Sequence, residues 1–446
     1  MNRVLFVDYW TQGIHNFTRL REASQGNVDY TLLHLGSYHD ANTPRLEIVQ
    51  RIPSVDIAAF RGLSLKEILR SLAPDVVVGL NIGGLFDRAI CLTCRSLDIP
   101  LVFLQHGVWA EKKQFMVLCE EMDKKRGFGA RVQALPKFLR MAPWYARECR
   151  GGVFSPNLWK VLYHIAKKPA ISRYFPPLAD EVWPTLACVF AEVYAEMLIE
   201  NVRIPRERIL VIGNPELDAA AFRRDNPRPT SELSEMLRCI GFAPGAPVVC
   251  FVEDAFVEQQ GLFGWDEQVR HSAIKELYDA CRSAGAQLLV RPHPAMSASA
   301  TDSIRTAFDG MPGFYISRSW SLIDTFECAD AVVGTISTAL ETAIIMQRPI
   351  LSPTWHINGQ VGFSAYLTHG AAIPVTNRSD LEGTIKRVLR GNFRHDTSGY
   401  VDRRLGPVDG HAATRAADAL LAAASRVHDR VSNGNPVVSA LTISRA

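Results

Sequence analysis

Residues 64–80 read Ser-Leu-Lys-Glu-Ile-Leu-Arg-Ser-Leu-Ala-Pro-Asp-Val-Val-Val-Gly-Leu, and this stretch decides the fold class. Ser64 and Glu67 have the spacing of a capping box, which predicts that a helix begins at Ser64. Pro74 ends that helix, and the apolar run at 75–80 predicts a short strand buried on both faces. A helix followed at once by such a strand is typical of a parallel α/β sheet.

The same alternation continues on both sides of this stretch. Further strands are expected at 4–7, 30–35, 101–105, 185–191, 209–212, 248–252, 287–291, 331–333, 349–351 and 372–375. Helices are expected at 86–97, 193–202, 267–284, 337–346, 381–389 and 411–424. We therefore predict an α/β protein with two doubly wound, Rossmann-like lobes that face a cleft.

A polar stretch with prolines and turn residues, 222–246, interrupts the alternation and predicts the lobe boundary. The N-terminal lobe is then 1–222 and the C-terminal lobe 246–428. Residues 429–446 lack periodicity, and we expect a disordered tail there.

The 446 residues carry a net charge of only +3 with 47% hydrophobic residues, which is typical of a globular protein and argues against nucleic-acid binding. The insert 121–174 is different, because it holds twelve Lys/Arg against three acids, and eight aromatic residues. Such a composition suits an anionic membrane surface or an anionic lipid-linked glycan. A solvated charged face above core aromatics is the alternative.

Nine scattered cysteines, an odd number, indicate a reducing compartment. Cys91 and Cys94 form an isolated C-x-x-C without a second pair, so no metal is expected. The N-terminal residues lack a signal-peptide pattern, and no apolar run has the length of a membrane span. We expect a cytoplasmic protein that could lie peripherally at the inner face of the inner membrane.

Arg291-Pro292-His293-Pro294 directly follows an expected strand. The two prolines restrict the backbone on both sides of the histidine. Arg291 and His293 are thereby held at the carboxyl end of the strand, where α/β sheets bind ligands. An arginine fork and an imidazole N–H suit a phosphate group. A stiff surface turn is the alternative.

Gly334-Thr335-Ile336-Ser337-Thr338-Ala339-Leu340-Glu341 joins a strand to a helix. Ser337 is a natural N-cap, and backbone N–H groups at a helix start bind anions. We predict that Thr335, Ser337 and Thr338 bind phosphate. Glu341 lies one turn further on the same face and could accept hydrogen bonds from ribose hydroxyls. A capped helix with an acidic first turn is the alternative.

Gln105-His106-Gly107 follows a strand of the first lobe. His106 could serve as a general base or as a ligand of an acceptor hydroxyl. Glu111 is a second candidate base, and Asp8, at the end of the first strand, is a third. A satisfied structural histidine is the alternative for His106.

Several familiar nucleotide and metal motifs are missing from the sequence. It has no G-x-x-x-x-G-K-[ST], no strand-borne G-x-G-x-x-G and no Asp-x-Asp. We therefore expect no cofactor and no metal, with Arg291, His293 and the 335–338 helix start meeting the phosphate charge.

The order of short motifs resembles the bacterial surface-polysaccharide transferases of the GT-B fold, a group that includes Kdo, sialyl and polyol-phosphate transferases. The motifs that carry the resemblance are 105–107, 213–218, 291–294, 334–341 and 409–415. It implies a sugar-nucleotide donor, most often with a CMP leaving group, in the C-terminal lobe and a glycan or glycolipid acceptor in the N-terminal lobe. It also implies that His293, Ser337 and Thr338 contact the donor phosphate, and that the terminal helix at 411–424 packs back across the lobes.

Related sialyltransferases use an acidic pair followed by Gly in the first lobe as their base. Here the nearest pair, Glu253-Asp254-Ala255, lies in the second lobe and lacks the Gly. The leading hypothesis is a metal-independent glycosyltransferase for capsule or lipopolysaccharide glycans. A sugar-nucleotide 2-epimerase of the same fold and a non-catalytic polysaccharide assembly protein are the alternatives.

Overall fold

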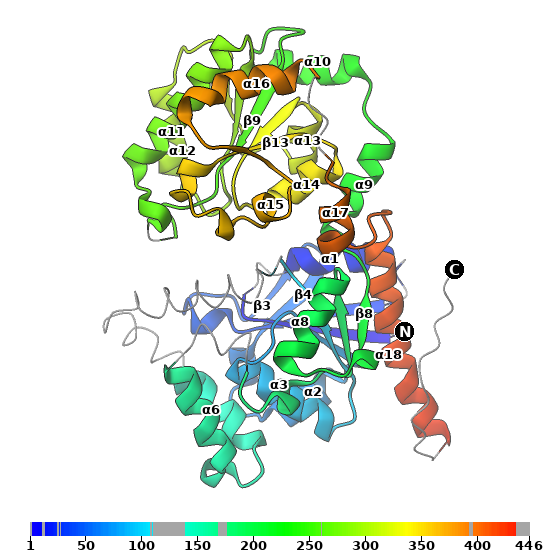
Figure 1. Cartoon of the computed structure of the whole chain (residues 1–446). Coiled ribbons are helices and arrows are strands. Elements are labelled where there is room, and N and C mark those ends of the chain that lie inside the picture. The colour runs from blue at the N-terminus through cyan, green and yellow to red at the C-terminus, as the bar shows by residue number, and fades with distance from the viewer. Residues whose placement is uncertain are drawn as a thin grey trace. The chain divides into compact units, whose positions relative to one another are not determined.

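The computed structural model describes residues 2–10, 14–24, 26, 28–107, 109, 139–167, 176–259, 261–391 and 396–433. The chain divides into two compact units (Figure 1). Unit 1 comprises Met1–Glu216 and His411–Ala446, and unit 2 comprises Leu217–Gly410. Each is built on its own open sheet, as the two Rossmann-like lobes of the prediction require. Within the described ranges, no helix is both long enough and apolar enough to cross a bilayer.

The sheet of unit 1 has the strand order β3-β4-β2-β1-β5-β6-β7-β8. Its strands are β1 (Asn2–Asp8), β2 (Val28–His34), β3 (Leu46–Val49), β4 (Ile52–Asp56), β5 (Val76–Gly79), β6 (Leu101–Leu104), β7 (Leu186–Val189) and β8 (Ile209–Val211). All neighbouring pairs are parallel except β3 with β4. The order reverses between β1 and β5, which is where doubly wound sheets bind ligands.

Helices cover both faces of this sheet. They are α1 (His15–Ala23), α2 (Leu65–Leu72), α3 (Leu85–Ser96), α6 (Pro156–Lys167), α8 (Glu192–Val202) and α18 (Ala412–Asn433). Alternate residues of β1 enter opposite cores, with Val4 and Phe6 in one and Leu5 and Val7 in the other. The capping box of α2 is present, and the expected strand at 75–80 is β5.

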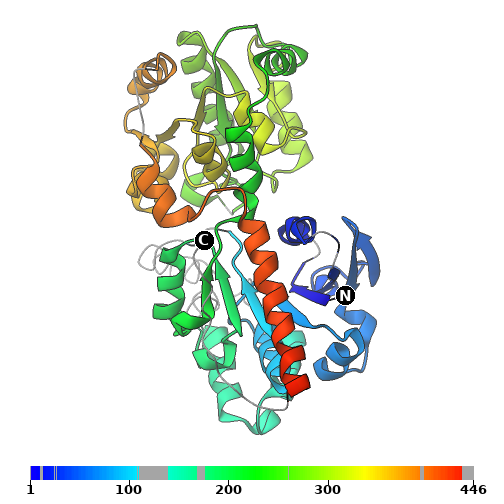
Figure 2. The same cartoon turned by 90° about the vertical axis from the view of Figure 1, so that its right-hand side faces the viewer.

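The last helix belongs to unit 1, although the sequence placed it in the C-terminal lobe. Small apolar residues of α18 pack into the core formed by β1, β2 and β5: Ala416, Ala419, Leu420, Ala423 and Ala424. Figure 2 shows α18 running along the sheet of unit 1. The alanines allow the helix to approach the strands closely. The helix continues to Asn433, past the predicted end of the lobe at 428, and 434–446 lie outside the described residues.

The sheet of unit 2 has the order β11-β10-β9-β12-β13-β14, and every pair is parallel. Its strands are β9 (Val248–Val252), β10 (Gln287–Arg291), β11 (Phe314–Ile316), β12 (Ala331–Val333), β13 (Ile350–Pro353) and β14 (Ile373–Val375). Here the order reverses at β9, between β10 and β12. The carboxyl ends of these three strands therefore form the expected ligand-binding edge.

The helices of unit 2 are α9 (Asp218–Asp225), α10 (Thr230–Cys239), α11 (Glu267–Ser283), α12 (Ala298–Ala307), α13 (Leu322–Glu327), α14 (Ala339–Ile345), α15 (Ala365–Thr368), α16 (Leu381–Leu389) and α17 (Ser398–Tyr400). The stretch 222–246, predicted as an inter-lobe break, is largely helical. The units divide earlier, between Glu216 and Leu217. Ala220 and Ala221 of α9 are buried against α13 and α14, which is why α9 belongs to unit 2.

Candidate functional site

The two loops singled out in the second half of the sequence flank β9 of unit 2. Arg291 ends β10 opposite Val252 of β9, and Val333 ends β12 opposite Phe251. Parallel strands present their carboxyl ends at one edge, so the loops at 291–294 and 334–338 emerge at the same edge of the sheet. Glu253 and Asp254 follow β9 between them.

Arg291 is half-buried, and its guanidinium donates a hydrogen bond to the carbonyl of Trp320. Burial lowers the pKa of Arg291 below its ordinary value, and the nearby Arg318 lowers it further. The Trp320 contact holds the side chain at the end of β10. The other guanidinium N–H groups can donate hydrogen bonds to the oxygens of a phosphate.

The ring of His293 is oriented by its own loop. Its Nδ1 atom accepts a hydrogen bond from the Ala295 N–H at 3.1 Å, and its carbonyl accepts one from the Met296 N–H at 2.9 Å. The proton of the neutral ring therefore lies on Nε2, which becomes a hydrogen-bond donor. Burial lowers the pKa of His293, and Glu258 acts in the opposite direction. Near neutral pH, this loop presents an uncharged Nε2–H group.

The loop after β12 differs from the prediction, because its backbone N–H groups already have a partner. Oδ1 of the buried Asp254 accepts hydrogen bonds from Ile336 N–H at 3.0 Å and Ser337 N–H at 2.7 Å. Oδ2 accepts from Thr335 N–H at 3.1 Å and from the Thr335 hydroxyl. The predicted phosphate site on these three N–H groups is wrong, since a carboxylate of the protein occupies it. Thr335 shapes the loop instead.

The carboxyl group of Asp254 is buried, and burial disfavours its ionised form. Burial raises the pKa of Asp254 above its ordinary value, while the hydrogen bonds from Thr335, Ile336 and Ser337 favour the ionised form. The two carboxylate oxygens accept four hydrogen bonds from residues 335–337, so Asp254 holds this loop in its conformation. The sequence interpretation noted Asp254 only as half of an acidic pair. Asp254 lies just after a buried strand, at the point where the strand order reverses, and this position could have indicated a role at the site.

The remaining members of the predicted nucleotide site take different positions. Ser337 is half-buried, and its hydroxyl accepts from Ala339 N–H at 3.4 Å; Thr338, rather than Ser337, is the N-cap residue of α14. Thr338 is exposed. Glu341 lies in the first turn of α14 and is only 2% exposed. The hydroxyls of Ser337 and Thr338 are thus the groups of this loop that a ligand can reach.

A cluster of charges surrounds the buried guanidinium of Arg270; in it Glu253 is buried, whereas Glu267 is 52% exposed. The guanidinium of Arg270, on α11, is within 3.2 Å of Glu253, 2.6 Å of Glu258 and 3.0 Å of Glu267. Burial raises the pKa of Glu253 to about 7, against the lowering effect of Arg270. Burial is the larger effect, and the nearby carboxylates of Glu258 and Asp254 add to it, so the pKa of Glu253 stays raised despite the neighbouring guanidinium.

In unit 1, the predicted base His106 lies at the carboxyl edge of the sheet, just after β6. Its Nδ1 atom is 2.9 Å from the carbonyl of Leu80, so Nδ1 carries the proton and Nε2 keeps a free electron pair in the neutral ring. Gly107 has φ +63°, which lets the chain turn directly after His106. This histidine is oriented as a proton acceptor, the opposite of His293.

Gln105 locks this turn, a role that sequence reasoning missed. Its side-chain carbonyl accepts from Phe190 N–H at 2.9 Å, and its amide donates to the carbonyl of Gly107 at 3.1 Å. The side chain is 2% exposed. It ties the loop after β6 to the end of β7 (Leu186–Val189) and so positions His106.

Asp8 also lies at this edge, at the end of β1. Oδ1 of Asp8 accepts from Tyr9 N–H at 2.7 Å and from the Asn81 amide at 3.5 Å. Asp8 is 8% exposed. Asn81 follows β5, so Asp8 and Asn81 occupy the reversal of strand order in unit 1. Glu111, the second candidate base, lies outside the described residues.

Two other motifs have structural roles. The side chain of Asn214 accepts from Glu216 N–H at 3.0 Å, a turn that ends the first segment of unit 1. Burial raises the pKa of Cys91 to about 11 and that of Cys94 well above its ordinary value, so both remain thiols. In the ranges that the structure describes, no three His, Cys, Asp or Glu side chains gather as a metal site would require.

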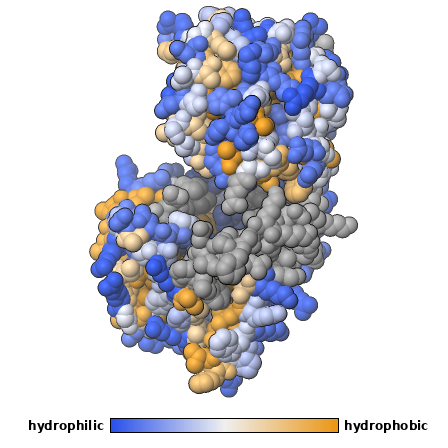
Figure 3. Space-filling view, turned by 90° about the vertical axis from the view of Figure 1, so that its left-hand side faces the viewer, coloured by the Kyte–Doolittle hydropathy of each residue, from blue (hydrophilic) through white to orange (hydrophobic). Residues whose placement is uncertain are grey.

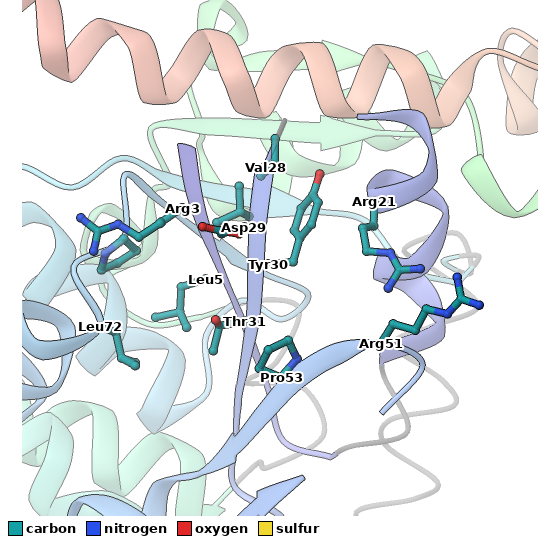
Figure 4. Close-up of a pocket in the computed structure, with 12 residues that line it drawn as sticks. Arg3, Leu5, Arg21, Val28, Asp29, Tyr30, Thr31, Arg51, Pro53 and Leu72 are labelled. Atoms are coloured by element: carbon teal, nitrogen blue, oxygen red, sulfur yellow. The ribbon is translucent and has the colours of Figure 1, made fainter. Parts of the chain in front are cut away.

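A pocket of about 350 Å³ lies at the opposite, amino edge of the unit 1 sheet (Figure 4). Arg21 and Arg51 approach each other on one side of β2, and Arg3 lies on the other side. Because ligands of doubly wound sheets bind at the carboxyl edge, this pocket is separate from the candidate site.

Comparisons with known proteins show which solved structures have a similar architecture. No protein-family model matches the sequence, and no curated protein matches it. Solved structures do match. The UDP-GlcNAc 2-epimerase of Methanocaldococcus jannaschii has a TM-score of 0.55 and 12% identity, over 95% of this chain and 100% of that chain. The UDP-GlcNAc 2-epimerase of Neisseria meningitidis has a TM-score of 0.53 and 11% identity, over 95% and 100%.

The wall teichoic acid polymerase TagF is similar to the same extent, with a TM-score of 0.55 and 13% identity over 96% of this chain and 90% of that chain. These proteins have the GT-B fold. The chain therefore has two Rossmann-like units of the GT-B type, as predicted. At this identity the likeness shows the fold alone.

Proposed function

We propose that this protein is a metal-independent glycosyltransferase that moves a sugar from a nucleotide donor to a glycan acceptor. The observation that carries the proposal is the opposite orientation of two histidines. His293, in unit 2, presents an Nε2–H donor beside Arg291, and His106, in unit 1, presents an Nε2 acceptor. Glycosyl transfer needs both kinds of group, a donor for the leaving phosphate and a base for the attacking hydroxyl.

The proposed reaction assigns a role to each side chain. His106 Nε2 accepts the proton of the acceptor hydroxyl, whose oxygen then forms a bond to the anomeric carbon of the donor sugar. The bond from that carbon to the phosphate oxygen breaks. Arg291 and the Nε2–H of His293, with the hydroxyls of Ser337 and Thr338, stabilise the charge on the departing phosphate. Glu111 remains the alternative base.

The donor is proposed to be a sugar nucleotide, and a CMP-sugar is favoured by the resemblance of the motifs. The structures of similar fold include one described as bound to UDP-GlcNAc and one from a CDPG soak. Glu341 is proposed to contact the ribose, which requires its buried carboxyl to become accessible when the nucleotide binds. The nucleotide-sugar is a substrate, and the reaction as proposed uses no cofactor.

The acceptor is proposed to be a capsule or lipopolysaccharide glycan, or a glycolipid precursor of one. Such a role would place the protein in the cytoplasm, at the inner face of the inner membrane. A nucleic-acid partner is not part of the proposal, because the net charge is only +3.

A transfer assay tests the proposal. Purified protein is incubated with a panel of CMP-, CDP-, UDP- and GDP-sugars and with bacterial surface glycans, and release of the nucleotide is measured with and without acceptor. We expect release that depends on the acceptor and that is lost in His293→Ala. Acceptor-dependent release at the wild-type rate in His293→Ala would contradict the assignment.

The 2-epimerase is the second candidate, because two structures of similar fold are UDP-GlcNAc 2-epimerases. That reaction moves a proton at a sugar carbon and needs no acceptor. Incubation with the donor in deuterated water distinguishes the two: deuterium entering the sugar without acceptor supports the epimerase. A non-catalytic assembly protein would bind none of the nucleotides.

A further inference from the structure

Unit 1 carries a group of exposed apolar side chains on and next to α6. Phe154 is 88% exposed, Tyr163 66%, Trp159 61% and Val153 58%. We call these four residues the aromatic ridge. An exposed group of large apolar side chains marks an interaction site far more often than a single one does.

The ridge is built on a firmly packed helix. Leu158 and Val161 of α6 are buried in the core of unit 1, so the opposite face of the helix points outward. Trp159, Tyr163 and Lys167 follow one another at intervals of four residues and lie on that outer face. The indole of Trp159 donates to the carbonyl of Val153 at 2.9 Å, which ties the preceding turn, with Phe154, to the helix.

The chain segment that carries the ridge is rich in cations, and Lys167 lies over the ring of Tyr163. Between residues 139 and 167, five Lys/Arg face a single acid. These are the exposed residues Arg140, Arg147, Arg150, Lys160 and Lys167. The acid, Glu148, is already paired with Lys66 at 3.7 Å. Figure 3 shows hydrophobic side chains gathered on the lower part of unit 1, the end at which Figure 1 places α6.

We propose that the aromatic ridge docks unit 1 onto an anionic lipid bilayer. Phe and Val side chains enter the interface, and Trp and Tyr occupy the headgroup level, where one end of the ring is apolar and the other is hydrated. Lysines and arginines beside them attract anionic headgroups. A second copy of the chain fits this surface poorly, since the two sets of cations would face each other. Much of the insert 121–174 lies outside the described residues, so the proposal rests on 139–167 alone.

This surface deepens the proposed function, because a bilayer would carry a lipid-linked acceptor. Its test does not depend on catalysis. Full-length protein is sedimented with vesicles of phosphatidylglycerol and phosphatidylethanolamine, and separately with vesicles of phosphatidylcholine, at low and at high salt. The variant is Phe154→Ser/Trp159→Ser/Tyr163→Ser. Phe222→Ser, which removes a 63% exposed aromatic from unit 2, is the matched control.

We expect the wild type and Phe222→Ser to bind the anionic vesicles at low salt and to bind phosphatidylcholine much more weakly. The triple variant should lose at least about tenfold in binding. Lys160→Gln/Lys167→Gln should lose about fivefold per lysine and show a smaller salt dependence. Far-UV circular dichroism and the shift in unfolding temperature with nucleotide should be unchanged in all variants, so a failure of donor binding is distinguishable.

The proposal is overturned if the wild type ignores anionic vesicles or if the triple variant binds them as well as Phe222→Ser does. A wild-type dimer that becomes monomeric in the triple variant, without vesicle binding in either, would instead assign the ridge to a second copy and equally overturn it.

Discussion

At the scale of single residues, the decisive feature is which ring nitrogen of each histidine carries the proton. His106 donates from Nδ1 to a carbonyl, and His293 accepts at Nδ1 from a backbone N–H. One hydrogen bond in each unit therefore makes Nε2 of His106 a proton acceptor and Nε2 of His293 a hydrogen-bond donor.

The first prediction concerns His106. We expect His106→Ala to lower kcat by about 10²–10⁴, the usual contribution of a general base, and to leave nucleotide binding unchanged. His271→Ala, which removes a half-buried histidine from α11 of unit 2, is the control. Steady-state transfer rates and nucleotide titrations would show the two effects separately. An unchanged kcat would move the base to Glu111 or Asp8.

The second prediction concerns Glu253, whose pKa burial raises to about 7. An unfolded Glu has a pKa of about 4.3, so the folded protein binds an extra proton between these values. The stability from this group is present below the lower pKa and is lost as the pH rises through the upper one. We expect about 2 kcal/mol of stability to be lost between about pH 5.5 and 8, and Glu253→Gln to remove that loss.

Thermal unfolding at several pH values, with Glu192→Gln as an exposed control, measures this effect. Equal pH slopes in the wild type and Glu253→Gln would show that Glu253 is ionised throughout. Unit 2 has its own transition if the two units unfold separately, and that transition is the one to compare.

The third prediction concerns Asp254. Asp254→Asn puts an amide donor among N–H groups that need an acceptor, and we expect unfolding free energy to fall by about 3 kcal/mol. Nucleotide affinity should fall as well, because the loop that carries Ser337 and Thr338 loses the carboxylate that holds its backbone N–H groups. Asp266→Asn is the control, since Asn caps a helix as well as Asp does. Equal losses in the two variants, measured by denaturant titration, would refute this role.

At the scale of elements, the strands that form apolar runs were predicted, whereas β3, β4 and β11, which are each partly exposed, were missed. Apolar runs such as 75–80 and 287–291 form β5 and β10 because both faces of a parallel strand are buried. The hairpin of β3 and β4 was missed. Leu46 and Ile48 of β3 are exposed, and the turn is Gln50-Arg51 rather than a familiar hairpin pair.

The candidate site was predictable only in part, for a physical reason. Local patterns located the Arg291–Pro294 loop and His106 at strand ends, and they also located Ser337 and Thr338. They could not reveal that Asp254 occupies the N–H groups of 335–337, because 81 residues or more separate the partners. A free helix start and an occupied one have the same local sequence. The orientation of His293 depends on Ala295, whose N–H gives no compositional signal.

At the scale of the whole molecule, the return of the chain to unit 1 departs from the predicted domain bounds, although the resemblance to GT-B transferases implied a terminal helix that packs back. The alanine face of α18 closes a core that the sheet of unit 1 leaves open, which ties residues 411–433 to strands hundreds of positions earlier. Unit 2 is thus an insertion between Glu216 and His411. The alanine-rich composition of the helix did not indicate which sheet it would cover.

The fourth prediction follows from this organisation. Deletion of 411–446 should expose the core of unit 1 and lower the solubility and unfolding temperature of the chain. A fragment of residues 217–410 should fold alone and show a cooperative transition. Circular dichroism and thermal unfolding of both proteins test this. A folded, soluble deletion variant with an unaltered unit 1 transition would contradict the assignment of α18.

The most direct test of the central claim is nucleotide-dependent stabilisation, measured as the unfolding temperature with CMP, CDP, UDP and GDP. A ligand that binds only the folded protein stabilises it by RT ln(1 + [L]/Kd), so the stabilisation keeps rising with the ligand concentration. We predict that at least one nucleotide, most strongly CMP, raises the unfolding temperature of the wild type and of His106→Ala, and that His293→Ala loses this rise. No rise with any nucleotide, or an equal rise in His293→Ala, would contradict a nucleotide-donor site at the carboxyl edge of unit 2.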